Sequence, residues 1–281
     1  GRSRISPACQ CFRSLAIIGG MSWLLQTLCN IVQWGCVAAW SFMWMTVAIV
    51  YGLLQPKSAK ITLSWARDYW SPGLARIAQA TIIKHSGFTP KPEDPYIFIM
   101  NHQSMFDIVA AMSLTPVNLR FIAKKVIQSV PFLGWYMTVA GMVFIDRRNR
   151  EAAVRSLEEA CQKIRNGASI LVYPEGTRST DGKILPFKKG PFIMAIQAGV
   201  PIVPIVIDKS HIVLGRNSLT MRKATVHFKI GEPIPTAGFT MAQRDELMKK
   251  VRDTIIDLHV SIGGAGGDKS LTISAEGKEG E

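Results

Sequence analysis

Acidic side chains are scarce in this sequence, which carries 33 lysines and arginines against 20 aspartates and glutamates, a formal net charge of +13 at pH 7. This balance favours anionic partners. Only 19% of the residues are charged and 48% are hydrophobic, which excludes a disordered chain and is high for a soluble protein. At 281 residues the chain is also too long for a small cross-linked scaffold. The composition indicates a membrane-associated protein.

Cysteine pairs are missing as well. The cysteines are odd in number and lack the paired spacing of metal ligands: Cys9, Cys11, Cys29, Cys36 and Cys161. We therefore expect neither a disulfide framework nor a zinc site, and a reducing, cytosolic environment fits best. No bound metal and no cofactor is expected.

Charge is absent from one long segment, residues 14–56. As a single helix it would be about 65 Å long, roughly twice the hydrocarbon thickness of a bilayer. Asn30, Gln33 and Gly35 interrupt the apolar run, so we predict an N-terminal hydrophobic helical hairpin. Basic residues flank both ends, and the positive-inside rule then places both flanks in the cytoplasm. The alternative, a cleaved signal peptide, needs a shorter apolar core and a small-residue cleavage site.

Beyond this segment, short β-rich runs alternate with stretches of helical period, which predicts an α/β domain with a mostly parallel or mixed sheet flanked by helices. The predicted strands are 96–100, 119–122, 142–145, 169–173, 202–207 and 225–230, and the predicted helices include 150–165 and 241–259. A glycine-rich polar stretch predicts a disordered tail. The expected organisation is an anchor over 1–57, a functional domain over 58–262 and a tail over 263–281.

The first core strand is followed by Asn-His-Gln-Ser-Met-Phe-Asp, residues 101–107. His102 and Asp107 can meet if the histidine lies in the turn before a helix and the aspartate lies in its first turn. A carboxylate on one ring nitrogen leaves the other nitrogen free as a general base for a hydroxyl. The alternative is a capping box from Ser104 to Asp107, in which the carboxylate only secures the helix N-terminus.

The strand at 169–173 is followed by Pro-Glu-Gly-Thr-Arg, residues 174–178. Proline and glycine favour a tight turn, which puts Arg178 at a strand end, where a guanidinium can bind phosphate bidentately. Lys124 and Arg147 follow two further predicted strands. Any one of these cations alone is read as a solvated surface residue, but their recurrence at strand ends favours an anion site.

In order along the chain, these motifs resemble the four sequence blocks of the glycerolipid acyltransferases, and most closely those of the 1-acyl-glycerol-3-phosphate acyltransferases. The blocks are Asn-His-x-x-x-x-Asp (101–107), Phe-Ile-Asp-Arg (144–147), Pro-Glu-Gly-Thr-Arg (174–178) and Val-Pro-Ile-Val-Pro (200–204). Four ordered blocks are far more specific than any one of them. The resemblance spans about residues 96–207 and implies the acyltransferase fold for the domain at 58–262.

The resemblance implies transfer of a fatty acyl group from acyl-CoA or acyl carrier protein to the sn-2 hydroxyl of lysophosphatidic acid, giving phosphatidic acid in phospholipid biosynthesis. His102 is then the general base and Asp107 its orienting partner. The implied phosphate-binding group is Lys124, Arg147, Glu175, Gly176, Thr177 and Arg178. Tyr173 stands where the family usually has phenylalanine, and a buried hydroxyl there needs a partner.

Two alternatives remain open from the sequence. One is the same chemistry on another acceptor, such as glycerol-3-phosphate or a lysophospholipid, and the other is a non-enzymatic basic protein of the membrane surface. The implied partners are membrane lipids, lysophosphatidic acid and the acyl donor. Nucleic acid is not expected, because aromatic residues are not interleaved with the cations. The implied location is the cytoplasmic (inner) membrane, with the active site on the cytoplasmic face.

Overall fold

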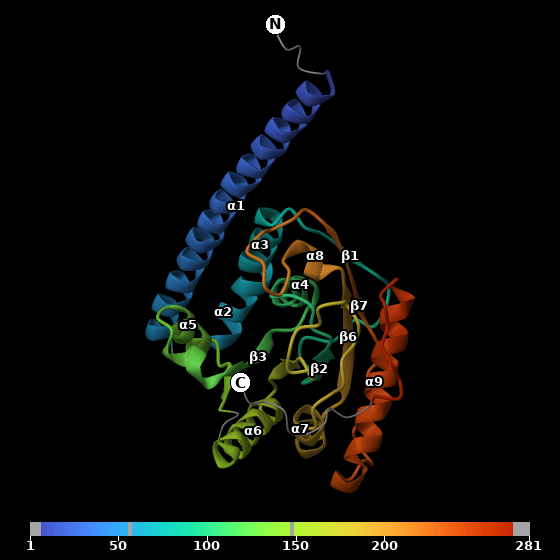
Figure 1. Ribbon diagram of the computed structural model, residues 1–281. Helices are drawn as coiled ribbons and strands as arrows, with labels where there is room; N and C mark the ends of the chain where they lie inside the picture. The colour runs from blue at the N-terminus through green and yellow to red at the C-terminus, as the bar shows by residue number, and fades with distance from the viewer. Residues whose placement is uncertain (1–6, 56–57, 147–148, 272–281) are drawn as a thin grey trace, which may run out of the picture.

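Seven strands form one mixed sheet in this computed structural model, within the residues that it describes, 7–55, 58–146 and 149–271 (Figure 1). The strands are β1 (Thr81–Lys84), β2 (Ile97–Met100), β3 (Leu119–Lys124), β4 (Val143–Ile145), β5 (Ser169–Val172), β6 (Ile202–Asp208) and β7 (Thr225–Ile230). The α-helices are α1 (Pro7–Leu54), α2 (Ala59–Trp65), α3 (Ser71–Ile77), α4 (Phe106–Leu114), α5 (Leu133–Val139), α6 (Arg150–Arg165), α7 (Gly190–Ala198), α8 (Ser210–Val213) and α9 (Arg244–Ser261). A π-helical turn spans Ala66–Trp70, and 3₁₀ turns span Lys125–Ser129 and Met241–Gln243.

The strand order is β1-β7-β6-β2-β5-β3-β4. The five strands from β6 to β4 are parallel, whereas β7 is antiparallel to β6 and parallel to β1. The α/β class and the mostly parallel or mixed sheet are therefore confirmed. Strand β1 was not predicted, because it is short and its residues are half-buried to exposed at the edge of the sheet. The carboxyl ends of the five parallel strands meet at one edge, which is where ligands bind in such folds.

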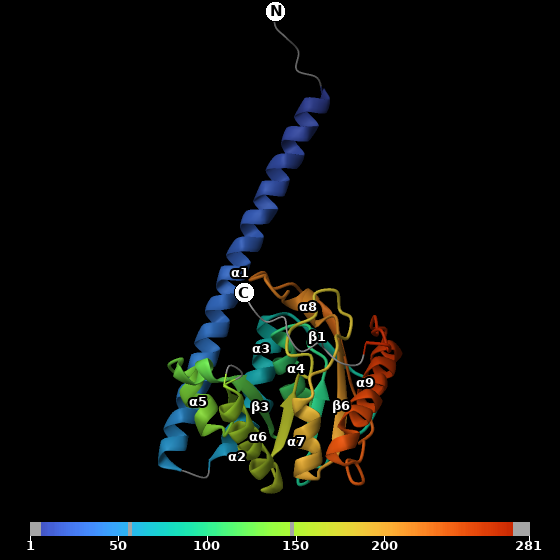
Figure 2. The same cartoon turned by 60° about the horizontal axis from the view of Figure 1, so that its bottom comes forward.

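Helices cover both faces of the sheet (Figures 1 and 2). In β2, which is buried throughout, Ile97 and Ile99 face a core shared with α6, α7 and α9, whereas Phe98 and Met100 face a core shared with α3 and α4. This alternation follows from the two-residue period of a strand. A strand covered on both faces needs apolar residues at every position, and the continuous run at 97–100 meets that need.

The predicted helical hairpin is wrong, because α1 runs as one continuous helix from Pro7 to Leu54 and extends well past the domain (Figures 1 and 2). Within it, the segment Leu25–Leu54 has a mean hydropathy of 1.8 and is long and apolar enough to cross a membrane. Only 6% of its most apolar window is buried, so α1 is not the core helix of a soluble domain. Its exposed apolar surface indicates membrane association.

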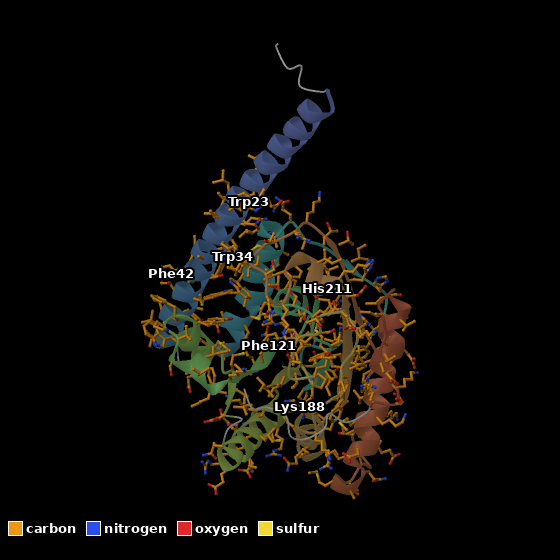
Figure 3. The ribbon with its side chains drawn as sticks, in the orientation of Figure 1. Trp23, Trp34, Phe42, Phe121, Lys188 and His211 are labelled. Carbon is orange, nitrogen blue, oxygen red and sulfur yellow. The ribbon has the colours of Figure 1, made fainter. Side chains whose placement is uncertain are left out.

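The polar residues that were read as a turn hold α1 against the domain instead. Asn30 Oδ1 accepts a hydrogen bond from the amide of Met221 at 2.9 Å, and Gln33 Nε2 donates to the carbonyl of Ile77 at 3.1 Å. The indole nitrogen of Trp34, labelled in Figure 3, donates to the carbonyl of Leu219 at 2.6 Å. Polar side chains whose hydrogen bonds are made by the domain are compatible with a continuous helix. The polar residues in the apolar run therefore mark the face of α1 that contacts the domain.

The predicted tail is also partly wrong. Residues 263–271 return to the domain, where Gly266 N donates to His259 Nδ1 at 3.1 Å and Arg252 Nη1 donates to a main-chain carbonyl of this segment at 2.7 Å. The side chains of His259 and Arg252 belong to α9 and are buried. The segment 263–271 therefore provides hydrogen-bond partners for His259 Nδ1 and Arg252 Nη1. Composition alone does not reveal such contacts. Residues 272–281 of the predicted tail lie outside the described residues.

Candidate active site

His102 and Asp107 meet in the corner between β2 and α4. The imidazole Nδ1 lies 2.7 Å from Asp107 Oδ2, and the histidine side chain is 14% exposed while the carboxylate is fully buried. A carboxylate accepts hydrogen bonds only, so Nδ1 carries the proton and donates it. The Nε2 atom then has a free lone pair at the surface of the site, which suits a general base.

The carboxylate of Asp107 also holds the corner together. Its Oδ2 accepts hydrogen bonds from the amides of Gln103 at 2.7 Å and Ser104 at 2.9 Å, and its Oδ1 accepts one from the hydroxyl of Ser210. The amide bond to Ser104 is one half of the capping contact considered above. The structural and the catalytic interpretations of Asp107 are thus compatible, since one buried carboxylate makes both sets of contacts.

Tyr173, at the end of β5, stacks on the imidazole of His102 with ring centroids 3.9 Å apart and an angle of 17° between the planes. Its hydroxyl is buried and has no hydrogen-bond partner among the described residues. Burial, and then the negative charge of Asp107, hold the pKa of the Tyr173 phenol well above its usual value. The sequence analysis expected a hydrogen-bond partner for this hydroxyl, and the described part of the chain does not provide one.

Glu175 joins the two motifs. Its Oε1 accepts from the amide of His102 at 2.9 Å and its Oε2 from the amide of Leu185 at 3.1 Å, while the amide of Ser179 donates to the carbonyl of His102 at 2.8 Å. The side chain is 4% exposed, and burial raises the pKa of the Glu175 carboxyl to about 8. Main-chain donors occupy both oxygens, so Glu175 shapes the turn and supports His102 instead of facing a phosphate.

The rest of the Pro-Glu-Gly-Thr-Arg turn has the tight geometry that the sequence predicts. Gly176 has φ +72°, and a β-carbon there would lie 2.7 Å from the Cε of Lys188, so this position favours glycine. Thr177 is exposed and Arg178 is half-buried. The carbonyl of Arg178 accepts a hydrogen bond from Arg216 Nη1 at 3.2 Å. A second guanidinium, that of Arg216, therefore lies next to the backbone of Arg178.

Lys124 ends β3, which pairs with β5 in parallel, and β5 pairs with β2 in parallel. The carboxyl ends of these three strands therefore share one edge of the sheet, with His102 after β2, Arg178 after β5 and Lys124 at the end of β3. The Lys124 side chain is exposed. Arg147 lies outside the described residues, although β4, which precedes it, is the next parallel strand along.

A cavity of about 470 Å³ lies next to the corner that holds His102 and Asp107, between α1 and the domain. Its wall includes Met105 and Phe106 from the corner, Trp34 from α1, Phe121 from β3 and Leu214 after α8; Trp34 and Phe121 are labelled in Figure 3. The lining is almost entirely apolar. Such a cavity suits a hydrocarbon chain.

Three supporting residues were missed from the sequence. The amide of Asn101 pairs with both main-chain groups of Ile207 at 2.9 Å. Gln103 Oε1 lies 3.1 Å from His211 Nδ1, and Ser210 bonds to Asp107. Asn101 and Gln103 lie inside the 101–107 motif, directly beside His102, so their position next to the candidate base could have indicated a supporting role. Ser210 follows the end of β6, and only the rule that sites gather at strand ends could have pointed to it.

This arrangement, a histidine held by a buried carboxylate beside a cationic turn at the carboxyl edge of an α/β sheet, fits an acyltransferase, and a sequence profile of the family described as Acyltransferase matches residues 82–208. A Saccharomyces cerevisiae 1-acyl-sn-glycerol-3-phosphate acyltransferase is 37% identical over 172 residues, which cover 60% of this chain and 57% of the yeast protein. The chain thus spans little more than half the length of that relative. The Caenorhabditis elegans relative acl-2 is 31% identical over 191 residues, 67% of this chain and 68% of the worm protein.

A crystal structure of the 1-acyl-sn-glycerophosphate (LPA) acyltransferase PlsC from Thermotoga maritima superimposes with a TM-score of 0.71 and 26% sequence identity. The match covers 84% of this chain and 96% of the Thermotoga chain. The chain belongs to the 1-acyl-sn-glycerol-3-phosphate acyltransferases of the glycerolipid acyltransferase family.

Proposed function

We propose that this protein transfers a fatty acyl group from acyl-CoA or acyl carrier protein to the sn-2 hydroxyl of lysophosphatidic acid, producing phosphatidic acid. The observation that carries the proposal is the 2.7 Å contact of His102 Nδ1 with a fully buried Asp107 carboxylate, which leaves Nε2 free at the edge that also holds Arg178. The names of the yeast and Thermotoga relatives describe the same activity.

In the proposed reaction His102 Nε2 removes the proton of the acceptor hydroxyl as its oxygen bonds to the thioester carbonyl carbon. Asp107 holds the ring and stabilises the imidazolium that forms. The tetrahedral intermediate then collapses, the carbon–sulfur bond breaks, and the proton passes from the imidazolium to the departing sulfur. A thiol has a pKa of about 8.5, so the thiolate is a good leaving group. The products are the ester and a free thiol, and no covalent enzyme intermediate is needed.

For the acceptor phosphate we propose Arg178 and Lys124 together with Arg147, with Glu175, Gly176 and Thr177 shaping the turn that carries Arg178. A guanidinium and ammonium groups at one sheet edge provide charge-assisted hydrogen bonds to a phosphate. The glycerol backbone is short, so its phosphate must bind near the base. Strand β5, which leads to Arg178, is the direct neighbour of β2, and β3, which ends at Lys124, is the next strand after β5. This proximity supports a phosphorylated acceptor.

The apolar cavity supports a lipid substrate, because it opens beside the catalytic corner and α1 forms part of its wall. An acyl chain entering from the membrane would reach it along α1. We further propose that the domain lies on the cytoplasmic face of the cytoplasmic membrane. The acyl donors are cytosolic thioesters, and a net charge of +13 attracts the chain to anionic headgroups.

The test measures free thiol release and phosphatidic acid formation by the purified chain in mixed micelles. We expect His102→Ala to lower kcat by at least about 100-fold and Arg178→Ala to raise KM for lysophosphatidic acid about tenfold. His85→Ala is the matched control, because His85 follows β1 at the opposite edge of the sheet. Near-normal turnover by the His102 variant would refute the role of the base.

The alternatives from the sequence are separated by the same assay. A panel of acceptors that includes glycerol-3-phosphate and a lysophospholipid identifies the preferred hydroxyl. Binding to anionic vesicles without consumption of any acyl thioester would favour a non-enzymatic surface protein. The buried His102–Asp107 pair argues against that alternative, because a carboxylate buried under an imidazole gives no advantage in binding lipid headgroups.

A further inference from the structure

A second cavity, which is polar and has a volume of about 380 Å³, lies along β4 at the open edge of the sheet, between the 3₁₀ turn at Lys125–Ser129 and α6. Its wall includes Lys125, Phe144, Asp146, Arg155, Glu159 and Lys163. None of these residues takes part in the proposed chemistry at His102. We call this cavity the β4 groove.

Two cations of the β4 groove have no ion-pair or hydrogen-bond partner among the described residues. These are Lys125 and Arg155, both exposed. Lys163 is different, since its Nζ donates to the carbonyls of Gly141 and Met142 at 3.1 Å and pairs with Glu159 at 2.8 Å. It serves the protein's own structure. Unpaired positive charge in a cavity attracts an anionic ligand.

The rest of the β4 groove suits an adenine nucleotide. Phe144 offers a half-buried aromatic ring to a purine. The first turn of α6 borders the cavity at Ala152, whose amide donates to the N-cap side chain of Asn149 at 2.9 Å, so this amide does not contribute to anion binding. Two cations and an aromatic ring thus lie on one concave surface.

The distance from the base also fits. Strands β2, β5, β3 and β4 are successive neighbours, so β4 lies about 14 Å from β2 at the usual strand spacing. The pantetheine arm of coenzyme A has about the main-chain length of four residues between its sulfur and its diphosphate, roughly 14 Å when extended. A pantetheine arm of this length can therefore span the distance from a thioester at His102 to β4.

We propose that the β4 groove binds the 3′-phosphoadenosine diphosphate of an acyl-CoA donor through Lys125 and Arg155. This rests on the proposed function, and it assigns the second anionic group of the two substrates, since the acceptor phosphate is taken up by the turn at Arg178. A free lipid headgroup shares the phosphate chemistry, but it does not use the aromatic ring of Phe144. The cavity has the size of a nucleotide and not of a carrier-protein surface.

The test uses the full chain in detergent and adenosine 3′,5′-bisphosphate as the probe. We compare wild type with Lys125→Gln, Arg155→Gln and the double variant. Lys250→Gln is the matched control, an exposed cation on α9 outside the β4 groove. Each lost charge-assisted contact should raise the Kd of the probe about tenfold. KM for acyl-CoA should rise in parallel, while KM for lysophosphatidic acid stays unchanged.

Equal probe binding by wild type and the double variant would overturn the proposal, even if acyl transfer continued. So would a double variant that lost binding only to anionic vesicles, or that raised KM only for an acyl carrier protein. Probe binding that depends on Lys125 and Arg155 would support the site even if the wild-type chain made no phosphatidic acid. In that case only the proposed reaction would fail.

Discussion

Glu175 gives the sharpest test of how the two motifs are joined. Its carboxyl is buried, and both oxygens accept main-chain hydrogen bonds, from His102 and Leu185. Burial raises its pKa from 4.5 to about 8. The pKa of this carboxyl is higher in the folded chain than in the unfolded chain. Between pH 4.5 and about 8 the folded chain therefore keeps a proton that the unfolded chain has lost. Stability should therefore decline as the pH rises from about 4.5 to 8 and level off above that.

The size of the effect follows from the same shift. Each pKa unit corresponds to about 1.4 kcal/mol, so the rise to about 8 amounts to about 5 kcal/mol across the window. Glu175→Gln removes the titrating group. The stability of the variant relative to wild type should improve by about 1.4 kcal/mol per pH unit between pH 5 and 8. The amide nitrogen of glutamine cannot accept a hydrogen bond, which costs about 1–3 kcal/mol at every pH.

The measurement is the free energy of unfolding in detergent, followed by tryptophan fluorescence at intervals from pH 5 to 9. Glu246→Gln, an exposed position on α9, is the matched control and should keep the wild-type slope. Parallel pH profiles for wild type and Glu175→Gln would refute the reasoning, because they would show that this carboxyl titrates alike in the folded and the unfolded chain.

Two further substitutions test the geometry around His102. Tyr173→Phe removes a buried hydroxyl with no partner among the described residues, so it should raise stability by about 1 kcal/mol and keep acyl transfer through the retained ring stacking; a tenfold loss of kcat would instead show that the hydroxyl meets the substrate. Gly176→Ala should destabilise the fold by about 1–2 kcal/mol at φ +72°. Gly167→Ala, at φ +83° with no atom within 4 Å, isolates the conformational cost. The atoms near Gly176 belong to the flexible end of the Lys188 side chain, which can shift at little cost, so thermal unfolding should show similar losses for both variants; a much larger loss for Gly176→Ala would contradict this.

Several parts of the fold and site were predictable because they depend on local sequence. The apolar run at 97–100 and the amphipathic stretch at 150–165 became β2 and α6. The five-residue separation of His102 and Asp107 put both side chains at one strand-to-helix corner. The hairpin prediction failed at Asn30, because the same residue can mark a turn or a docking contact and only its partner distinguishes them.

The sequence by itself determined which groups are present: the order of the motifs, the His102–Asp107 pair, the excess of cations and the apolar N-terminal segment. These are properties of residue type and short spacing. The tertiary structure decided what each group faces. It turned the Glu175 carboxylate inward onto the backbone of His102, stacked Tyr173 on the imidazole and formed the β4 groove from segments far apart along the chain. The physical reason is that burial and hydrogen-bond partnership depend on contacts between distant segments, and no local pattern encodes them.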